Sequence, residues 1–191
     1  MVTRVKSLKE LENEIKKLKS NTLVVFVISG KKYHEVNIFI LKKLIQLKKF
    51  SGIYISLNRP FKNLVKYLKE KKIDTDKIFF IDCVSSFFGE AKLAENCLFV
   101  PSPSRLTDIG IALDEAIRRM KNPSNKFLFL DSVSTLLIYN DLKVVAQFIH
   151  YLATKLRKFG VIGILMTVEK EIEERFLNFL IQISDKIIEV V

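Results

Sequence analysis

Runs of apolar residues alternate with amphipathic helical patterns along the chain, and this alternation constrains the fold more than any other feature. Residues 23–28 are apolar throughout, which is typical of a central strand buried on both faces of a sheet. Strands that alternate with helices predict a parallel sheet with helices on both sides. We therefore expect an α/β protein with three layers, α/β/α, and a mostly parallel sheet. The expected strands are 23–28, 52–57, 77–82, 127–130, 161–167 and 186–191, with a short one at 98–100.

Capping residues and helical periodicity locate the segments between these strands. Ser7 and Glu10 form a capping box that opens the first helix. Thr107 is the expected N-cap of a later helix, and Gly160 should close the longest one. The expected helices cover residues 7–19, 36–50, 60–72, 107–120, 141–158 and 171–183, with a long surface segment at 84–104 and a turn at 122–125.

Length and composition indicate one folded domain. The chain has 191 residues, of which 49% are hydrophobic, enough for a substantial core. No apolar run reaches the roughly 18 residues that a membrane span needs, and the N-terminus lacks the apolar region of a signal peptide. We expect a single domain over residues 1–191, with an N-terminal helix in 1–20 and the core in 21–191. A cytoplasmic protein without a membrane partner is the corresponding expectation.

The cysteines and histidines do not form a recognisable reactive or metal-binding motif. Cys83 and Cys97 lie far from both histidines in the sequence, so we expect the two cysteines to be small buried apolar residues. His34 and His150 are well separated and give little support to a catalytic triad. A metal cluster or a nucleophile-based enzyme is therefore not expected.

The net charge of +11 is concentrated in the N-terminal part of the chain. Residues 1–72 contain 18 Lys or Arg and 5 Asp or Glu, whereas residues 73–191 contain 14 and 16. A basic half can bind nucleic acid or another anionic surface. Most of these lysines also fit the solvent faces of helices, and a chain rich in Lys, Ile and Phe resembles thermophilic proteins, which are adapted to heat. Both interpretations stay open.

Two segments have the form of nucleotide-binding elements. Residues 29–34, Ser-Gly-Lys-Lys-Tyr-His, join an expected strand to an expected helix, where the P-loop G-x-x-x-x-G-K-[ST] would lie. Only one glycine is present there, at Gly30. The apolar run 127–130 is followed by Asp131 and Ser132, as in a Walker B strand that presents a carboxylate to magnesium. An aspartate at this point can also be a simple helix cap or turn former.

These segments, in this order, resemble the RecA-like P-loop ATPases, and among them the KaiC-like branch that is abundant in archaea. Residues 130–136, Leu-Asp-Ser-Val-Ser-Thr-Leu, are similar to the Walker B segment of that branch. The other segments that resemble its strands are 52–57 with the following Pro60, 77–82, 160–167 and 184–189. The resemblance covers residues 20–191 and implies a RecA-like sheet, a site for ATP and magnesium, and subunits that assemble side by side.

The resemblance also identifies where this chain departs from the family. The family's P-loop lysine, magnesium-binding hydroxyl and second glycine correspond to Tyr33, His34 and Lys32. Its paired catalytic glutamates correspond to Asn58 and Arg59. Phosphoryl transfer depends on such positioning and electrostatics. The resemblance therefore implies a divergent member with a degenerate Walker A motif that has lost ATP hydrolysis.

Three hypotheses for function follow. The first is an inactive domain, a pseudo-ATPase with no catalytic residue and no cofactor, that binds a protein partner or itself. The second is a weak binder of ATP, another nucleotide or phosphate, because a helix N-terminus offers N–H groups to an anion, although Glu35 opposes an anion there. The third is nucleic-acid binding through the basic half. The candidate nucleotide-binding residues are Ser29, Gly30, Lys31, Lys32, Tyr33, His34, Asp131 and Ser132, and Asp131 is a metal ligand only if a magnesium nucleotide binds.

Overall fold

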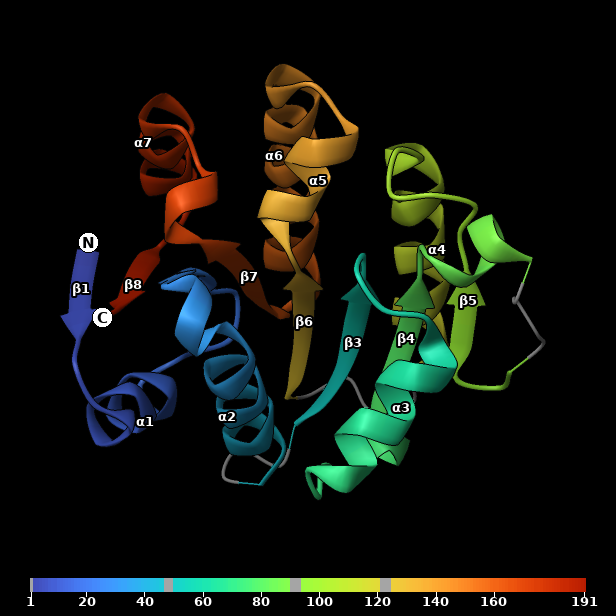
Figure 1. Ribbon diagram of the computed structural model, residues 1–191, viewed down its shortest axis with the longest axis horizontal. Coiled ribbons are helices and arrows are strands. Elements are labelled where there is room, and N and C mark those ends of the chain that lie inside the picture. Colours follow the sequence, from blue (N-terminus) through green and yellow to red (C-terminus); the bar gives the residue numbers. More distant parts are fainter. Residues whose placement is uncertain (1, 47–49, 90–93, 121–124) are drawn as a thin grey trace.

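A parallel sheet forms the centre of the protein. The computed structural model describes residues 2–46, 50–89, 94–120 and 125–191 (Figure 1). Within them eight strands pair, all in parallel, in the order β1-β8-β2-β7-β6-β3-β4-β5. The strands are β1 Val2–Val5, β2 Leu23–Ile28, β3 Ser51–Ser56, β4 Ile78–Asp82, β5 Cys97–Phe99, β6 Lys126–Asp131, β7 Ile162–Val168 and β8 Lys186–Val190.

Helices cover both faces of the sheet, which confirms the expected three-layer α/β/α fold (Figure 1). Side chains of a strand alternate between the faces. In β2, Val24 and Phe26 therefore join the core under α1–α3, whereas Leu23 and Val25 join the core under α4–α7. The first layer contains α1 Leu8–Lys16, α2 Tyr33–Gln46 and α3 Phe61–Glu70, and the second contains α4 Leu106–Arg119, α5 Val133–Tyr139, α6 Leu142–Phe159 and α7 Glu174–Ile183.

A close approach between β3 and β6 requires a glycine. Gly52 lies opposite Phe127 in the register of these two strands. A Cβ atom at Gly52 would come within 2.1 Å of the Phe127 ring, far closer than atoms can approach. The fully buried Phe127 ring therefore occupies the space that a side chain at residue 52 would need.

The N-terminal segment differs from the prediction. Residues 1–20 were expected to contain only a helix, but Val2–Val5 forms β1, which pairs with β8 at the edge of the sheet. Helix α1 begins after Ser7, whose hydroxyl accepts the Glu10 N–H as a capping box predicts. The Glu10 carboxylate accepts from the Lys6 N–H instead of completing the box at Ser7.

Several helix boundaries also differ. Helix α2 begins at Tyr33, not at residue 36, and α7 begins at Glu174, because Glu169–Glu171 forms a short 3₁₀ helix. Thr107 lies inside α4, whose N-cap is Arg105, so its prediction as a cap is wrong. Pro60, expected in the first turn of α3, is its N-cap.

Other expectations hold or lie outside the described residues. Gly160 closes α6 in the left-handed conformation, as expected. Helix α5 was not predicted. Both cysteines are buried, and burial raises the pKa of the Cys83 and Cys97 thiols above the ordinary range. The end of the expected helix 36–50 at residues 47–49 and most of the expected turn 122–125 lie outside the described residues. None of the described helices is long and apolar enough to cross a membrane.

Candidate functional site

The candidate site lies where neighbouring strands of the sheet lead to opposite layers. Strand β3 continues into α3 in one layer, and its neighbour β6 continues into α5 in the other. In open α/β sheets, the carboxyl ends of strands at such a switch point form the usual binding crevice. Asp131 is the last residue of β6 and is 8% exposed. The fold therefore places this carboxylate at the position where a ligand would be expected.

Two tyrosine hydroxyls occupy both oxygens of the Asp131 carboxylate. The Tyr33 hydroxyl donates to Asp131 Oδ1 at 2.5 Å, and the Tyr54 hydroxyl donates to Oδ2. Tyr33 is the first residue of α2, and Tyr54 lies within β3. Both rings are buried, with 9% and 1% of their surface exposed. The three side chains form a closed polar cluster, which we call the tyrosine–aspartate cluster.

The tyrosines of this cluster remain protonated donors at neutral pH. Burial, and then the negative charge of Asp131, raises the pKa of Tyr33 well above its ordinary value. The same two causes raise the pKa of Tyr54. Asn37 lies one turn after Tyr33 on α2 and also hydrogen-bonds Tyr54. The hydroxyls are therefore held as donors by their surroundings.

The segment between β2 and α2 forms a tight 3₁₀ turn, Gly30–Lys32, that runs directly into the helix. The Lys32 N–H donates to the Ser29 carbonyl at 2.9 Å, and the Tyr33 N–H donates to the Gly30 carbonyl. The backbone at Gly30 is not left-handed, and a Cβ there would meet only Val168, at an ordinary 3.8 Å. This glycine does not supply the special conformation that a P-loop glycine supplies.

The other residues of this segment lie away from Asp131. Lys31 is exposed, and Lys32 Nζ donates to the Val191 carbonyl at 2.8 Å. His34 is exposed, with its Nδ1 atom 3.4 Å from the Arg59 guanidinium. Among the described candidate residues 29–34, Tyr33 is therefore the one whose side chain hydrogen-bonds the Asp131 carboxylate.

Residues around the end of β6 fix its exit into α5. The Ser132 hydroxyl accepts the Thr135 N–H at 3.2 Å, so Ser132 is the N-cap of α5. Asn58 accepts from the Thr135 hydroxyl at 2.8 Å and donates to the Asp131 carbonyl at 3.4 Å. Asn58 therefore connects the end of β3 to the start of α5.

Sequence reasoning missed Tyr54. It lies in the buried strand β3, and a tyrosine within an apolar run is expected to be a core residue. A signal was present, because a buried phenolic hydroxyl needs a hydrogen-bond partner. The sequence alone did not show which partner that would be.

Asp82 forms a second buried polar centre, at the end of β4. It is fully buried. Its carboxylate accepts hydrogen bonds from three backbone N–H groups and one hydroxyl. The donors are Phe61 N at 2.6 Å, Val84 N at 2.7 Å, Ser85 N at 2.9 Å and Ser85 Oγ at 2.5 Å. These bonds order the start of α3 and the 3₁₀ helix Ser85–Phe88. Within the described ranges, no group of three or more His, Cys, Asp or Glu side chains could hold a metal ion.

Solved structures of other proteins share this fold. An uncharacterised protein from Pyrococcus horikoshii, in complex with an unknown peptide, has a TM-score of 0.72 and 14% identity over 97% of this chain and 84% of that one. A KaiC-like protein from Pyrococcus horikoshii OT3 has a TM-score of 0.62 and 14% identity, covering 89% and 73%. The flagellar accessory protein FlaH from Methanocaldococcus jannaschii has 0.54 and 13%, covering 97% and 78%. These likenesses show that the chain has a RecA-like α/β/α fold.

The sequence itself identifies the family. Residues 63–190, more than half of the chain, match the family of unknown function DUF7504. The protein therefore belongs to the DUF7504 family. No curated protein matches its sequence.

Proposed function

We propose that this protein is a RecA-like domain that does not hydrolyse ATP and acts as a binding or assembly module. The tyrosine–aspartate cluster carries this proposal. In a working P-loop ATPase, the aspartate at the end of the Walker B strand faces magnesium. Here both oxygens of Asp131 accept hydroxyls from residues 98 and 77 positions away. The carboxylate that should serve the metal is engaged within the protein.

The residues at this site do not fit a magnesium nucleotide. Tyr33 stands where the family resemblance places the phosphate lysine, and a phenol at neutral pH carries no positive charge. The Lys32 and Tyr33 N–H groups are used inside the 3₁₀ turn, so they cannot cradle a phosphate. Asn58 stands at a glutamate position, and its amide cannot act as a base.

Binding of magnesium at Asp131 would carry a substantial cost in free energy. Magnesium at Asp131 would displace two buried hydroxyls, and each unpaired hydroxyl costs about 1–3 kcal/mol. A magnesium nucleotide would therefore begin with a deficit of roughly 2–6 kcal/mol, which is a factor of about 30 to 10⁴ in affinity.

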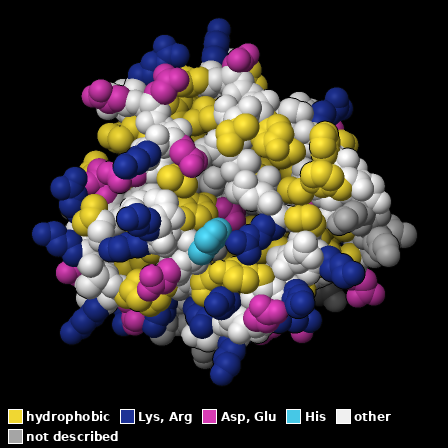
Figure 2. Space-filling model, in the orientation of Figure 1, with side chains coloured by type: hydrophobic (Ala, Val, Ile, Leu, Met, Phe, Trp, Pro, Cys, Tyr) yellow, Lys and Arg dark blue, Asp and Glu magenta, His cyan; other side chains and the backbone are white. Residues whose placement is uncertain are grey.

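Exposed apolar side chains support a role in binding or assembly. Ile138 and Tyr139 end α5 and are 75% and 52% exposed, and Phe87 and Phe88 of the 3₁₀ helix Ser85–Phe88 are 72% and 65% exposed. Figure 2 shows hydrophobic side chains gathered at the upper right of this face, over α5 and the segment between β4 and β5. Large apolar side chains that are exposed together are typical of interaction surfaces. The peptide recorded with one fold neighbour agrees with a binding role.

A nucleotide assay tests the proposal. We expect no magnesium-dependent ATP turnover, and no calorimetric heat or thermal shift with millimolar ATP or ADP. The matched control is Asp131→Asn, because a contaminating ATPase would survive that change. Turnover that disappears in Asp131→Asn would overturn the proposal. Saturable nucleotide binding without turnover would support the second hypothesis, with Lys31 as the cation to replace.

A further inference from the structure

Helix α3 and its flanks carry a net positive charge. Residues 59–77 contain seven basic and three acidic residues. Lys62, Lys66 and Lys69 repeat at helical spacing and are exposed, whereas Leu64 and Leu68 on the opposite side are 2% and 0% exposed. Residues spaced by three or four positions lie next to one another on a helix. The three lysines therefore form one outward-facing row.

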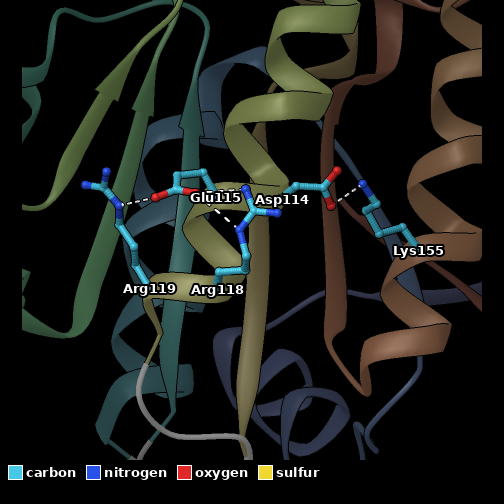
Figure 3. A network of polar contacts seen from close by, with 5 residues as sticks. All are labelled: Asp114, Glu115, Arg118, Arg119 and Lys155. Carbon is cyan, nitrogen blue, oxygen red and sulfur yellow. Dashed lines mark hydrogen bonds and ion pairs between the residues drawn. The ribbon is translucent and has the colours of Figure 1, made fainter.

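Several basic side chains on other helices form ion pairs with carboxylates. In α4, Glu115 pairs with Arg118 and Arg119, and Asp114 of the same helix pairs with Lys155 of α6 (Figure 3). In the other layer, Glu12 pairs with two lysines, which lower its pKa to about 2.

The row on α3 lacks such partners. Within the described part of the chain, Lys62, Lys66 and Lys69 have no carboxylate at ion-pair distance. Their charges are available to an external anion.

The row continues at both ends of α3. At its start, the Arg59 guanidinium lies 4.5 Å from the centre of the Tyr67 ring, and Lys71 Nζ lies 5.7 Å from the same ring. Tyr67 therefore holds two cations beside the lysine row. Figure 2 shows that Lys and Arg side chains are abundant on this face of the molecule.

A basic cavity lies beyond the end of α3. It has a volume of about 590 Å³ and is lined by Lys42, Lys72 and Lys77 together with Asp74 and neighbouring apolar residues. Asp74 offsets one of these charges, since it lies 3.5 Å from Lys77. Lys72 has a φ of 59°, a left-handed conformation that usually favours glycine or asparagine after a helix. Residue 72 is nevertheless a lysine, and it lines the basic cavity.

We propose that this surface binds the phosphate backbone of a nucleic acid strand. The surface, which we call the α3 stripe, runs from Arg59 along Lys62, Lys66 and Lys69 to the basic cavity. Lysine binds phosphate as a point charge, without reading sequence. The occupant therefore needs regularly spaced anions, and the binding is independent of base sequence.

An acidic protein is a poorer match to the α3 stripe. Protein interfaces are built around apolar or aromatic anchors and are depleted in lysine. On α3 the leucines face the core, and the exposed positions are mainly lysine. Interfaces with nucleic acid are more polar and much more positively charged. The proposal concerns the α3 stripe and does not depend on whether the Asp131 site binds a nucleotide.

Fluorescence anisotropy with labelled single-stranded and duplex 20-mers tests this proposal. The test variant is K62Q/K66Q/K69Q, and the matched control is K143Q/K158Q/K170Q, which removes the same charge from exposed lysines outside the stripe. We expect wild-type affinity to fall about 10- to 100-fold between 50 and 200 mM salt. The test variant should bind about tenfold more weakly at 100 mM salt, with a salt slope smaller by about 2. The control should stay within about twofold of wild type.

Three outcomes would overturn the proposal. One is absence of binding at 50 mM salt, and another is an equal loss in the control variant, which would show an effect of net charge alone. The third is displacement of the oligonucleotide by polyglutamate at an equal concentration of charge, which would indicate an acidic protein partner. Thermal melts of both variants establish that they are folded. ATP turnover by the wild type would overturn the proposed function and leave this inference intact.

Discussion

Asp82 and Asp131 occupy equivalent places on either side of β3 but are held in different ways. Both pair with Ser56 in the register of the sheet, and both are buried. Asp82 accepts backbone N–H groups from the segments that it orders. Asp131 accepts hydroxyls from two distant tyrosines. The Asp82 carboxylate holds the backbone of the segments around it. The Asp131 carboxylate lies at the switch point of the sheet and is held by side chains.

This difference separates an aspartate that holds the backbone from one that is held by side chains. When a carboxylate that accepts backbone N–H groups is removed, the turn or helix start that contains those groups loses its hydrogen bonds. A carboxylate bonded only to side chains can exchange its partners while the backbone stays in place. The origin of the donors is therefore more informative than burial, which the two residues share.

The largest effect is expected for Asp82→Ala. This change leaves three backbone N–H groups, one buried and two partly buried, and the Ser85 hydroxyl without their acceptor. We expect the free energy of unfolding to fall by about 3–5 kcal/mol, measured by urea denaturation. The control is Asp82→Asn, which keeps one acceptor oxygen and should lose less. A loss below about 1 kcal/mol for Asp82→Ala would contradict the structural role.

Asp131→Ala should have a smaller effect. Two tyrosine hydroxyls lose their partner, but no backbone group among the contacts of this side chain does. We expect a loss of about 2–4 kcal/mol in the same urea experiment. If Asp131→Ala proved more destabilising than Asp82→Ala, the distinction between the two sites would be wrong. An increase in stability would indicate a carboxylate retained for an external ligand.

Single removal of either tyrosine hydroxyl should cost less again. Tyr33→Phe and Tyr54→Phe each delete one hydrogen bond to a charged group, for an expected loss of about 1.5–3 kcal/mol. Double-mutant cycles that combine each change with Asp131→Asn measure the coupling between the partners. Additive effects, with coupling near zero, would show that the hydroxyls do not depend on this carboxylate.

Stability should decrease in alkali because of the same two tyrosines. Their pKa values are raised well above 10.0 in the folded protein. Above about pH 10 the unfolded chain releases these protons while the native protein retains them, so unfolding is favoured as pH rises. The stabilising contribution is complete below pH 10 and is lost towards the folded pKa values. Tyr33→Phe should flatten the decline between about pH 9.5 and 11 in thermal melts, whereas Tyr139→Phe, at an exposed position, should leave it unchanged.

The smallest effect is expected at the single glycine of the β2–α2 segment. Gly30 does not adopt a left-handed conformation and has room for a Cβ. Gly30→Ala should change the free energy of unfolding by less than about 1 kcal/mol, with a tendency to stabilise. Gly52→Ala, where the Phe127 ring blocks the Cβ, is the contrasting control. A large loss at Gly30 would mean that this segment retains a conformation that only glycine permits.

Much of the fold was predictable because buried parallel strands are apolar throughout. Strand β2 was located exactly as residues 23–28, and most of the other strands within one residue. Strand β1 was not predictable, since Val2–Val5 is short and lies at the sheet edge, and it is defined by pairing with β8 at the other end of the chain. Helix α5 was not predictable because its serine and threonine residues interrupt the helical spacing of apolar residues.

The site was only partly predictable. Tyr33 and Asp131 were both identified from the order of the segments, but their mutual contact depends on the 3₁₀ turn at Gly30–Lys32, which brings the start of α2 over the end of β6. Tyr54 was hidden in an apolar strand. The sequence gives the number of charges on α3, but whether its lysines form ion pairs depends on the neighbouring elements of the fold.

The tyrosine–aspartate cluster also couples the substitutions that its three positions can tolerate. Each of its three positions is supported by at least one of the others, so a change at one leaves buried polar groups without partners. A lysine in place of Tyr33 alone would put an ammonium group beside Asp131 while the Tyr54 hydroxyl still donated to one of its oxygens. Replacing one member of the cluster is therefore expected to require compensating substitutions at the other two positions.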